Sequence, residues 1–211
     1  MSELLTYLPG FATAYAILLV AVTSPGPAVA MLLGLSLSNG RGTALVACAG
    51  IASGGVLLNL GTMLGLGLLL SQIGWAMMVI KYLGAAYLAW LAYGAFRRSI
   101  SPPAVKADQE PKMSRVRAFV LGFLLQITNI KAIAFWLVIA AVGATTGGGA
   151  QVILAFAIGA FAISFLGHGA WAILLSSRVF QIAYAKARRW IEAVLGGLFA
   201  LLALRMAMDR S

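Results

Sequence analysis

The segment Ser24-Pro25-Gly26-Pro27 interrupts a continuous apolar stretch that is long enough to cross a membrane. Proline lacks the backbone N–H that a helix needs, and its ring clashes with the preceding turn, so a helix should break here. Inside lipid, the carbonyl groups that a break sets free must find partners within the protein. The chain must therefore fold so that this break is buried against other segments or lines a cavity.

The composition explains why the break lies in a membrane segment. Hydrophobic residues make up 62% and charged residues 9% of the 211 positions, whereas soluble domains are about half apolar and a quarter charged. The chain is therefore expected to be an all-α integral membrane protein. Because one crossing needs about 20 apolar residues, we predict six spans that leave no room for a soluble enzyme domain. They cover residues 8–37, 43–70, 75–96, 118–142, 152–175 and 190–207.

The distribution of basic residues predicts the topology. Basic residues gather in or beside the first, third and fifth connections, at Arg41, at Arg97, Arg98, Lys106, Lys112, Arg115 and Arg117, and at Arg178, Lys186, Arg188 and Arg189. The second and fourth connections, 71–74 and 144–150, carry none. Since basic connections stay in the cytoplasm, both termini should lie on the outer side. The basic connections account for the net charge of +10. We therefore expect membrane lipid, and not nucleic acid, as a partner of the chain.

The two halves of the chain resemble each other. Residues 24–31 are similar to residues 128–135, and a polar linker at 97–117 separates a first unit, 1–96, from a second unit, 118–211. Each unit holds three expected spans. Because three is odd, the second unit must enter the membrane from the opposite face. We therefore expect two inverted three-helix repeats, with interrupted first and fourth helices, that support alternating access.

Lys131 is the most costly residue to place in lipid. Counted from Arg117 at about 1.5 Å per helical residue, it lies roughly 21 Å into a core of about 30 Å. A lysine at this depth marks a functional site by default. Its role can be functional or structural. In a functional role, it binds a substrate carboxylate or changes its protonation state during transport. In a structural role, it serves only as a partner for backbone carbonyls.

Polar residues beside the two breaks are further candidates for substrate binding. Thr128 and Asn129 precede Lys131, and each can contact substrate or bond backbone groups of an interrupted helix. Ser24 has the same two possible roles. Gly26 lets the backbone approach a ligand, and Pro27 suits the first turn of a restarting helix, whose positive end attracts a carboxylate. With Pro25 these residues predict a site for an amino-acid carboxylate.

Two polar residues lie in other spans. Asn59, in the second span, can bind substrate or form a hydrogen bond between helices. His168, in the fifth span, titrates near neutral pH unless it is perturbed. It is a candidate proton carrier, with a satisfied core histidine as the alternative.

Small residues in the second span predict a close helix contact. Gly50, Gly54, Gly61 and Gly65 share one face. Such a face permits helices to approach each other within one subunit or in a homo-oligomer.

Acidic residues are absent from the first five expected spans, so a hard metal ion has no evident ligands. A cationic substrate side chain has no evident partner there either. Glu192 lies one turn after Arg188, a spacing that predicts an ion pair along one helix.

Phosphate-binding and catalytic motifs are missing from the sequence. We expect neither an enzyme nor a bound cofactor.

Four segments together resemble the LysE/RhtB family of bacterial amino-acid exporters. They are Ser24-Pro25-Gly26-Pro27, Gly40-Arg41-Gly42, the run from Lys81 to Leu88, and the segment from Gly122 to Asn129-Ile130-Lys131. The resemblance covers nearly the whole chain. It implies a transporter of the bacterial inner membrane that exports amino acids, with proton exchange, through Pro25, Gly26, Pro27, Asn129 and Lys131.

The chain departs from the family pattern at Ile130, where the family has proline. The fourth span should therefore bend less or break by other means. Our leading hypothesis is a proton-coupled exporter of small amino acids or related carboxylates. The alternatives are a non-transporting membrane scaffold and a passive channel.

Overall fold

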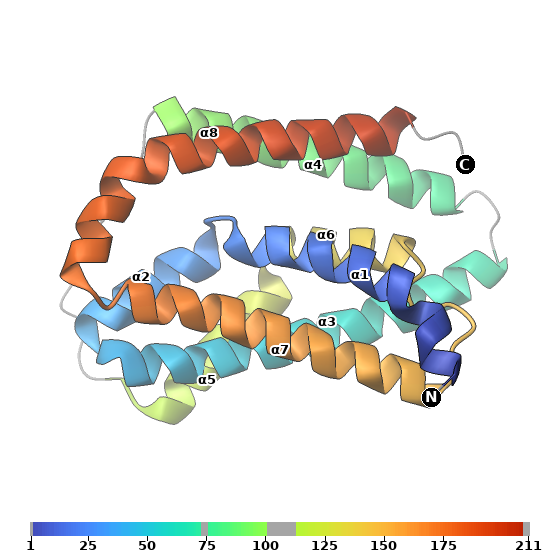
Figure 1. Cartoon of the computed structure of the whole chain (residues 1–211), viewed down its shortest axis with the longest axis horizontal. Coiled ribbons are helices and arrows are strands. Elements are labelled where there is room, and N and C mark those ends of the chain that lie inside the picture. The colour runs from blue at the N-terminus through green and yellow to red at the C-terminus, as the bar shows by residue number, and fades with distance from the viewer. Residues whose placement is uncertain (1, 73–75, 101–112, 209–211) are drawn as a thin grey trace.

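The computed structural model describes residues 2–72, 76–100 and 113–208, and every regular element in these ranges is an α-helix (Figure 1). The helices are α1 (Ser2–Thr23), α2 (Pro27–Ser38), α3 (Gly40–Gln72), α4 (Ala76–Ile100), α5 (Arg115–Thr128), α6 (Ile130–Ala141), α7 (Ala150–Leu174) and α8 (Arg178–Met208). The expected all-helical class is confirmed for this part. Residue 75, the expected start of the third span, and residues 101–112 of the linker lie outside the described residues.

Several helices have the length and composition of membrane spans. Among the described residues these are Leu4–Thr23, Gly40–Met63 and Ala150–Leu174. The α5–α6 pair is a fourth if it counts as one span bent by 61°. The chain is thus a multi-pass membrane protein, and the exact number of six spans stays a prediction.

The helices form two layers (Figure 1). Helices α4 and α8 lie side by side along one face, and the other helices form the thicker remainder of the bundle. An apolar cluster joins the layers: Leu88 and Leu91 of α4 and Phe199 of α8 pack with Phe135 of α6. Ala21 near the end of α1 contacts the same cluster. The break after α1 therefore lies at the seam between the two layers.

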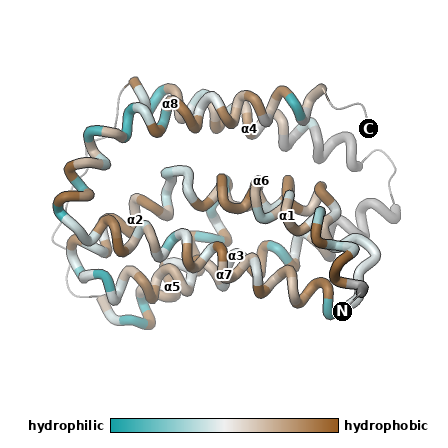
Figure 2. The backbone as a smooth tube through the Cα atoms, in the orientation of Figure 1, coloured by the Kyte–Doolittle hydropathy of each residue, from teal (hydrophilic) through white to brown (hydrophobic). Residues whose placement is uncertain are grey.

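The described basic helix ends lie together. Helices α3, α5 and α8 begin, and α4 ends, at one end of the bundle, whereas α1 begins and α8 ends at the other (Figure 1). Figure 2 shows hydrophilic residues at the start of α5 and along the first part of α8. Arg41, Arg98 and Arg115, from three different helix ends, thus share the side that the basic connections predict as cytoplasmic.

Glycines bring α3 and α5 into backbone contact. A Cβ on Gly50 would overlap the carbonyl of Phe119, and a Cβ on Gly122 would overlap the carbonyl of Ala47. A Cβ on Gly54 would lie 2.9 Å from Phe123 O. The expected close helix contact is therefore confirmed at Gly50 and Gly54.

The expected glycine face does not extend along all of α3. Gly61 has no described heavy atom within 4 Å of its Cβ position, and the surroundings of Gly65 lie outside the described part. Among the described glycines of this face, the close approach is thus confined to Gly50 and Gly54, which pack on α5.

We predict that Gly50→Ala lowers the free energy of unfolding by about 1–3 kcal/mol, because the added methyl group forces α3 and α5 apart. Gly61→Ala is the matched control on the same helix, since its methyl group enters open space. Its stability should be unchanged or higher by up to about 1 kcal/mol, because alanine has the better helix propensity. Thermal unfolding in detergent measures both, and equal stability of the two variants would contradict the contact.

Candidate functional site

The end of α1 is closed by donors from within the protein. Ser24 donates its backbone N–H to Val20 O and its hydroxyl to Ala21 O, each at 3.0 Å. The indole N–H of Trp171, from α7, donates to Val22 O at 3.2 Å. These bonds satisfy carbonyls that would otherwise face lipid without a partner.

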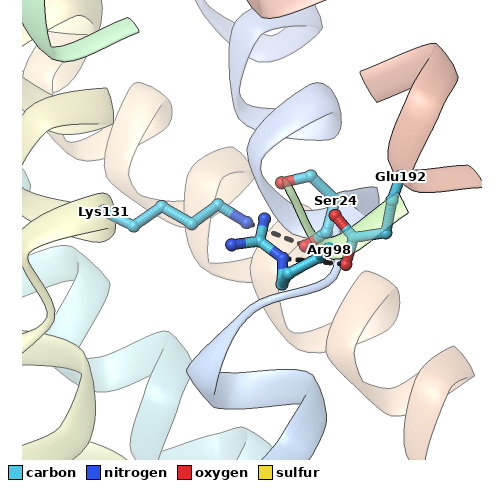
Figure 3. A network of polar contacts seen from close by, with 4 residues as sticks. All are labelled: Ser24, Arg98, Lys131 and Glu192. Carbon is cyan, nitrogen blue, oxygen red and sulfur yellow. Dashed lines mark hydrogen bonds and ion pairs between the residues drawn. The ribbon is translucent and has the colours of Figure 1, made fainter. Parts of the chain in front are cut away.

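Lys131 supplies the remaining donor to this helix end. It lies in the first turn of α6, and its Nζ donates to Ala21 O at 3.1 Å and to Ser24 O at 2.8 Å; Figure 3 shows the second bond. The ammonium is stabilised there because a helix carries partial negative charge at its C-terminal end. The expectation that Lys131 can serve backbone carbonyls is thus met, and its role toward substrate stays a prediction.

Gly26 allows the lysine to pass close to the break. Its backbone is extended, with φ −170° and ψ −165°, a conformation open to any residue. What the site requires is the absent side chain, because a Cβ at Gly26 would lie 3.3 Å from Lys131 Nζ. A larger residue would press on the ammonium.

The fourth expected span breaks at Asn129 without a proline. The residue has extended backbone angles, φ −76° and ψ 107°, and lies between α5 and α6. Its side-chain oxygen accepts the backbone N–H of Lys131 at 3.1 Å. This N-cap stabilises a new helix start, and the span bends by 61° at this break. The span is therefore broken by means other than proline, the second of the two expected outcomes.

The two restarted helices differ at their N-terminal ends. Asn129 caps α6, whereas α2 begins at Pro27 after Gly26 with no side-chain cap in the described structure. The backbone N–H groups of Ala28 and Val29 have no intrahelical acceptor at this position of a helix. The start of α2 is therefore the more open position for an anion.

A cavity lined by both polar and apolar residues lies between the two breaks. Its volume is about 40 Å³, room for roughly two or three water molecules. Six of the residues predicted for the site line it: Ser24, Gly26, Pro27, Asn129, Lys131 and His168. The fold thus brings together residues that are more than 100 positions apart.

Three residues predicted for the site lie outside the cavity lining. Pro25 is buried in the break. Thr128 is exposed, and its hydroxyl donates to Leu124 O of its own helix at 2.8 Å. Asn59 has no exposed surface, and both polar atoms of its side chain lack a described partner. The tertiary structure therefore does not place Asn59 or Thr128 with the other candidates.

Sequence reasoning missed polar residues that line the cavity. Gln126, in the last turn of α5, and Ser164, of α7, are both buried and line it. Gln126 stands three residues before Asn129 in an apolar span, a signal that could have identified it. Phe135 and Trp136 form part of the apolar wall.

His168 takes a defined orientation in the cavity wall. Its Nδ1 lies 2.9 Å from the carbonyl oxygen of Ser164, one turn earlier in α7. A carbonyl only accepts hydrogen bonds, so Nδ1 carries a proton and Nε2 is the ring nitrogen that can take up another. This geometry is compatible with a proton carrier and with a core histidine whose hydrogen bond is satisfied, the two alternatives for His168.

The structure corrects the expected partner of Glu192. Its Oε1 accepts a hydrogen bond from Nε of Arg98, of α4, at 3.0 Å. The expected partner, Arg188, lies on the same helix as Glu192, whereas Arg98 reaches the carboxylate from the adjacent helix of the layer. Figure 3 shows that this ion pair lies beside Ser24 and Lys131. One acidic side chain of α8 is therefore close to the broken helices.

Apolar spans that are interrupted around a cavity with polar lining residues are typical of membrane transporters. The family model "LysE type translocator" matches residues 19–210. The chain belongs to this family of translocators, and it is accordingly a transporter and not an enzyme.

Curated relatives are named as amino-acid exporters. The threonine efflux protein of Escherichia coli is 27% identical over 95% of this chain and 98% of its own length. The arginine exporter protein ArgO of Escherichia coli is 28% identical over 77% of this chain and 71% of its own. No solved structure matches the chain.

We predict that Asn129→Ala lowers the free energy of unfolding by about 0.5–2 kcal/mol, because α6 loses its cap. Asn129→Asp should retain most of the stability, since a carboxylate also accepts the N–H of Lys131. Thr128→Val is the neighbouring control, whose hydroxyl bonds only within α5. Thermal unfolding of the purified variants checks this, and an equal loss in Asn129→Ala and Thr128→Val would contradict the capping role.

Proposed function

We propose that the protein exports small amino acids or related carboxylates across the bacterial inner membrane by alternating access coupled to protons. The substrate carboxylate binds Lys131 and the open start of α2. Ser24, Gly26, Pro27 and Asn129 shape this site. The observation that carries the proposal is the position of Lys131, which lines a cavity between two broken helices and directs its Nζ to the end of α1.

The chemistry of this position supports carboxylate binding. Lys131 Nζ has three N–H groups, of which two point to Ala21 O and Ser24 O. The free backbone N–H groups at the start of α2 add donors and positive potential on the same side. An anionic group that enters the cavity therefore meets a charge and a helix end together.

The size of the cavity supports a change of conformation during transport. An amino acid has more atoms than the two or three waters that the cavity holds, so the lining helices must separate to admit it. The breaks after α1 and α5 provide the places where half-helices can tilt without losing internal hydrogen bonds.

The packing pattern supports two inverted repeats, 1–96 and 118–211. Helix α3 packs on α5, and its counterpart in the second unit, α7, packs on α1. Helix α3 also packs on α7, and α4 packs on α8. Exchange of the two units reproduces each of these contacts, as a twofold axis in the membrane plane requires.

The arrangement of charged ends supports a topology with the first, third and fifth connections in the cytoplasm. The described basic helix ends gather at one end of the bundle, and both termini then belong to the outer side. A cytoplasmic substrate would enter from the basic end. Lipid surrounds the bundle, and assembly as a homo-oligomer remains compatible with this arrangement.

Lys131→Gln tests the site most directly. The glutamine amide can still donate to a carbonyl at the end of α1, whereas the charge that holds the substrate is lost. We expect export of labelled threonine from proteoliposomes to fall roughly 10- to 100-fold, the loss that corresponds to a hydrogen bond to a charged group. Lys186→Gln, at an exposed position of α8, is the matched control and should keep full export.

The same measurement separates the competing functions. Saturable export that is lost only in Lys131→Gln supports the transporter. Flux that never saturates would indicate a channel. A scaffold is indicated if the wild type moves no amino acid and Lys131→Gln changes only assembly or stability.

Proton coupling makes a separate prediction for His168. If Nε2 carries the coupled proton, an imposed pH gradient should accelerate export in the wild type and have no effect in His168→Gln. Export driven by the amino-acid gradient alone should persist in the variant. Labelled threonine flux with and without the pH gradient measures this. A wild type that ignores the gradient would remove the proton from the mechanism.

A further inference from the structure

A partly buried ion pair joins α4 and α8 next to the proposed site. Arg98 lies in the last turn of α4, and Glu192 lies on α8. The Glu192 side chain is 1% exposed and that of Arg98 is 37% exposed. The carboxylate is thus enclosed by protein, and Arg98 compensates its charge from the more accessible side.

The ion pair and Lys131 belong to one electrostatic group. Figure 3 shows the Arg98 guanidinium and the Lys131 ammonium pointing toward the same region beside Ser24, with Glu192 next to Arg98. Lys131 interacts electrostatically with both Arg98 and Glu192. The three side chains come from α4, α6 and α8, so they meet only in the folded protein.

The charges of these three side chains add up to one excess positive charge, and Arg188, one turn before Glu192 on α8, adds a further cation to the surroundings. Lys131 and Arg98 contribute two cations, and Glu192 contributes one carboxylate. No described residue that lines the cavity is acidic. Every negative charge of the group is therefore taken up by Arg98, and the excess cation remains for a substrate carboxylate.

A basic amino acid would bring an additional cation to this region. A zwitterion with a neutral side chain matches the excess positive charge through its carboxylate, and its ammonium group can use neutral acceptors. The guanidinium of arginine or the side-chain ammonium of lysine would need a free carboxylate. Like charges at close range disfavour binding in a low-dielectric site.

We propose that Arg98, by neutralising Glu192, sets the charge selectivity of the transporter, so that it exports amino acids with uncharged side chains and rejects arginine and lysine. This inference rests on the proposed export function and names its substrate class.

The second carboxylate oxygen of Glu192 indicates what the site would do without Arg98. Oε2 is buried and has no hydrogen-bond partner among the described residues. Removal of the Arg98 guanidinium would leave both oxygens available near Lys131. Lys131 and Glu192 would then carry no net charge between them, and the carboxylate could accept a cationic side chain.

Four variants in proteoliposomes test the proposal. The measured quantity is the ratio of arginine to threonine export, each as kcat/KM with labelled amino acid. The wild type should have a ratio below about 0.1, since a tenfold preference corresponds to only about 1.4 kcal/mol. Arg98→Gln should raise the ratio at least tenfold. Arg97→Gln, one residue earlier and exposed, is the matched control and should leave it unchanged.

The carboxylate variants separate charge selectivity from a structural role. Glu192→Gln leaves two cations and should keep arginine excluded. The double variant Arg98→Gln/Glu192→Gln restores one excess cation and should return to the wild-type ratio. If the pair only holds α4 to α8, all three variants would slow threonine and arginine equally and leave the ratio unchanged, which would overturn the proposal.

The remaining outcomes are also decisive. Equal export of arginine and threonine by the wild type overturns this inference and leaves the export function intact. Failure of the wild type to export any amino acid overturns both. If Arg98→Gln does not fold, Gln126→Glu adds a carboxylate to the cavity wall independently. It should raise the ratio at least tenfold, and an unchanged ratio would overturn the charge rule.

Discussion

The hydrogen bonds from Lys131 to the end of α1 connect the main features of this structure. A helix that stops inside a membrane exposes carbonyl groups that lipid cannot satisfy. Lys131 reaches across from α6 and donates to Ala21 O and Ser24 O. These hydrogen bonds offset both the cost of burying the ammonium and the cost of ending the helix. The same contact brings the two broken spans together around the cavity.

Close helix packing makes this contact possible. The glycine crossing of α3 and α5 sets the approach of the two units, because carbonyl groups occupy the space that Cβ atoms would fill. Helix α7 packs on α1, and its Trp171 completes the hydrogen bonds at the end of α1. The site therefore depends on helices from both halves of the chain, as expected where a cavity lies at the interface of two repeats.

Helices α4 and α8 add charge next to the cavity, whose proposed binding groups lie on the broken helices. Helices α4 and α8 contact the remainder of the bundle through an apolar cluster, and the Arg98–Glu192 pair lies beside the break at Ser24. A charge in this position acts on Lys131 without touching it, because a protein interior screens charges less than water does. Helices α4 and α8 therefore contribute charge to the surroundings of Lys131 as well as apolar packing.

Local rules were enough to predict the break at Pro25-Gly26-Pro27, the membrane class and, as one of two alternatives, the bonds from Lys131 to backbone carbonyls. Proline chemistry acts between neighbouring residues, and the cost of a charge in lipid depends on the length of the apolar segment. The break at Asn129 was expected from the family resemblance, but its cause was not clear, because Ile130 replaces the usual proline. The capping oxygen of Asn129 supplies that cause, and cap geometry depends on backbone angles that the residue type leaves open.

The sequence by itself determined that this chain is helical, membrane-embedded and interrupted at two related positions, because these properties follow from residue type and local spacing. Only the tertiary structure decided which polar residues share a cavity. Helix rotation and crossing decide which side chains face one another, so Gln126 lines the cavity and Asn59 lies outside its lining. The same holds for Glu192: spacing along α8 predicted Arg188 as its partner, whereas the packing of α4 on α8 brought Arg98 to the carboxylate.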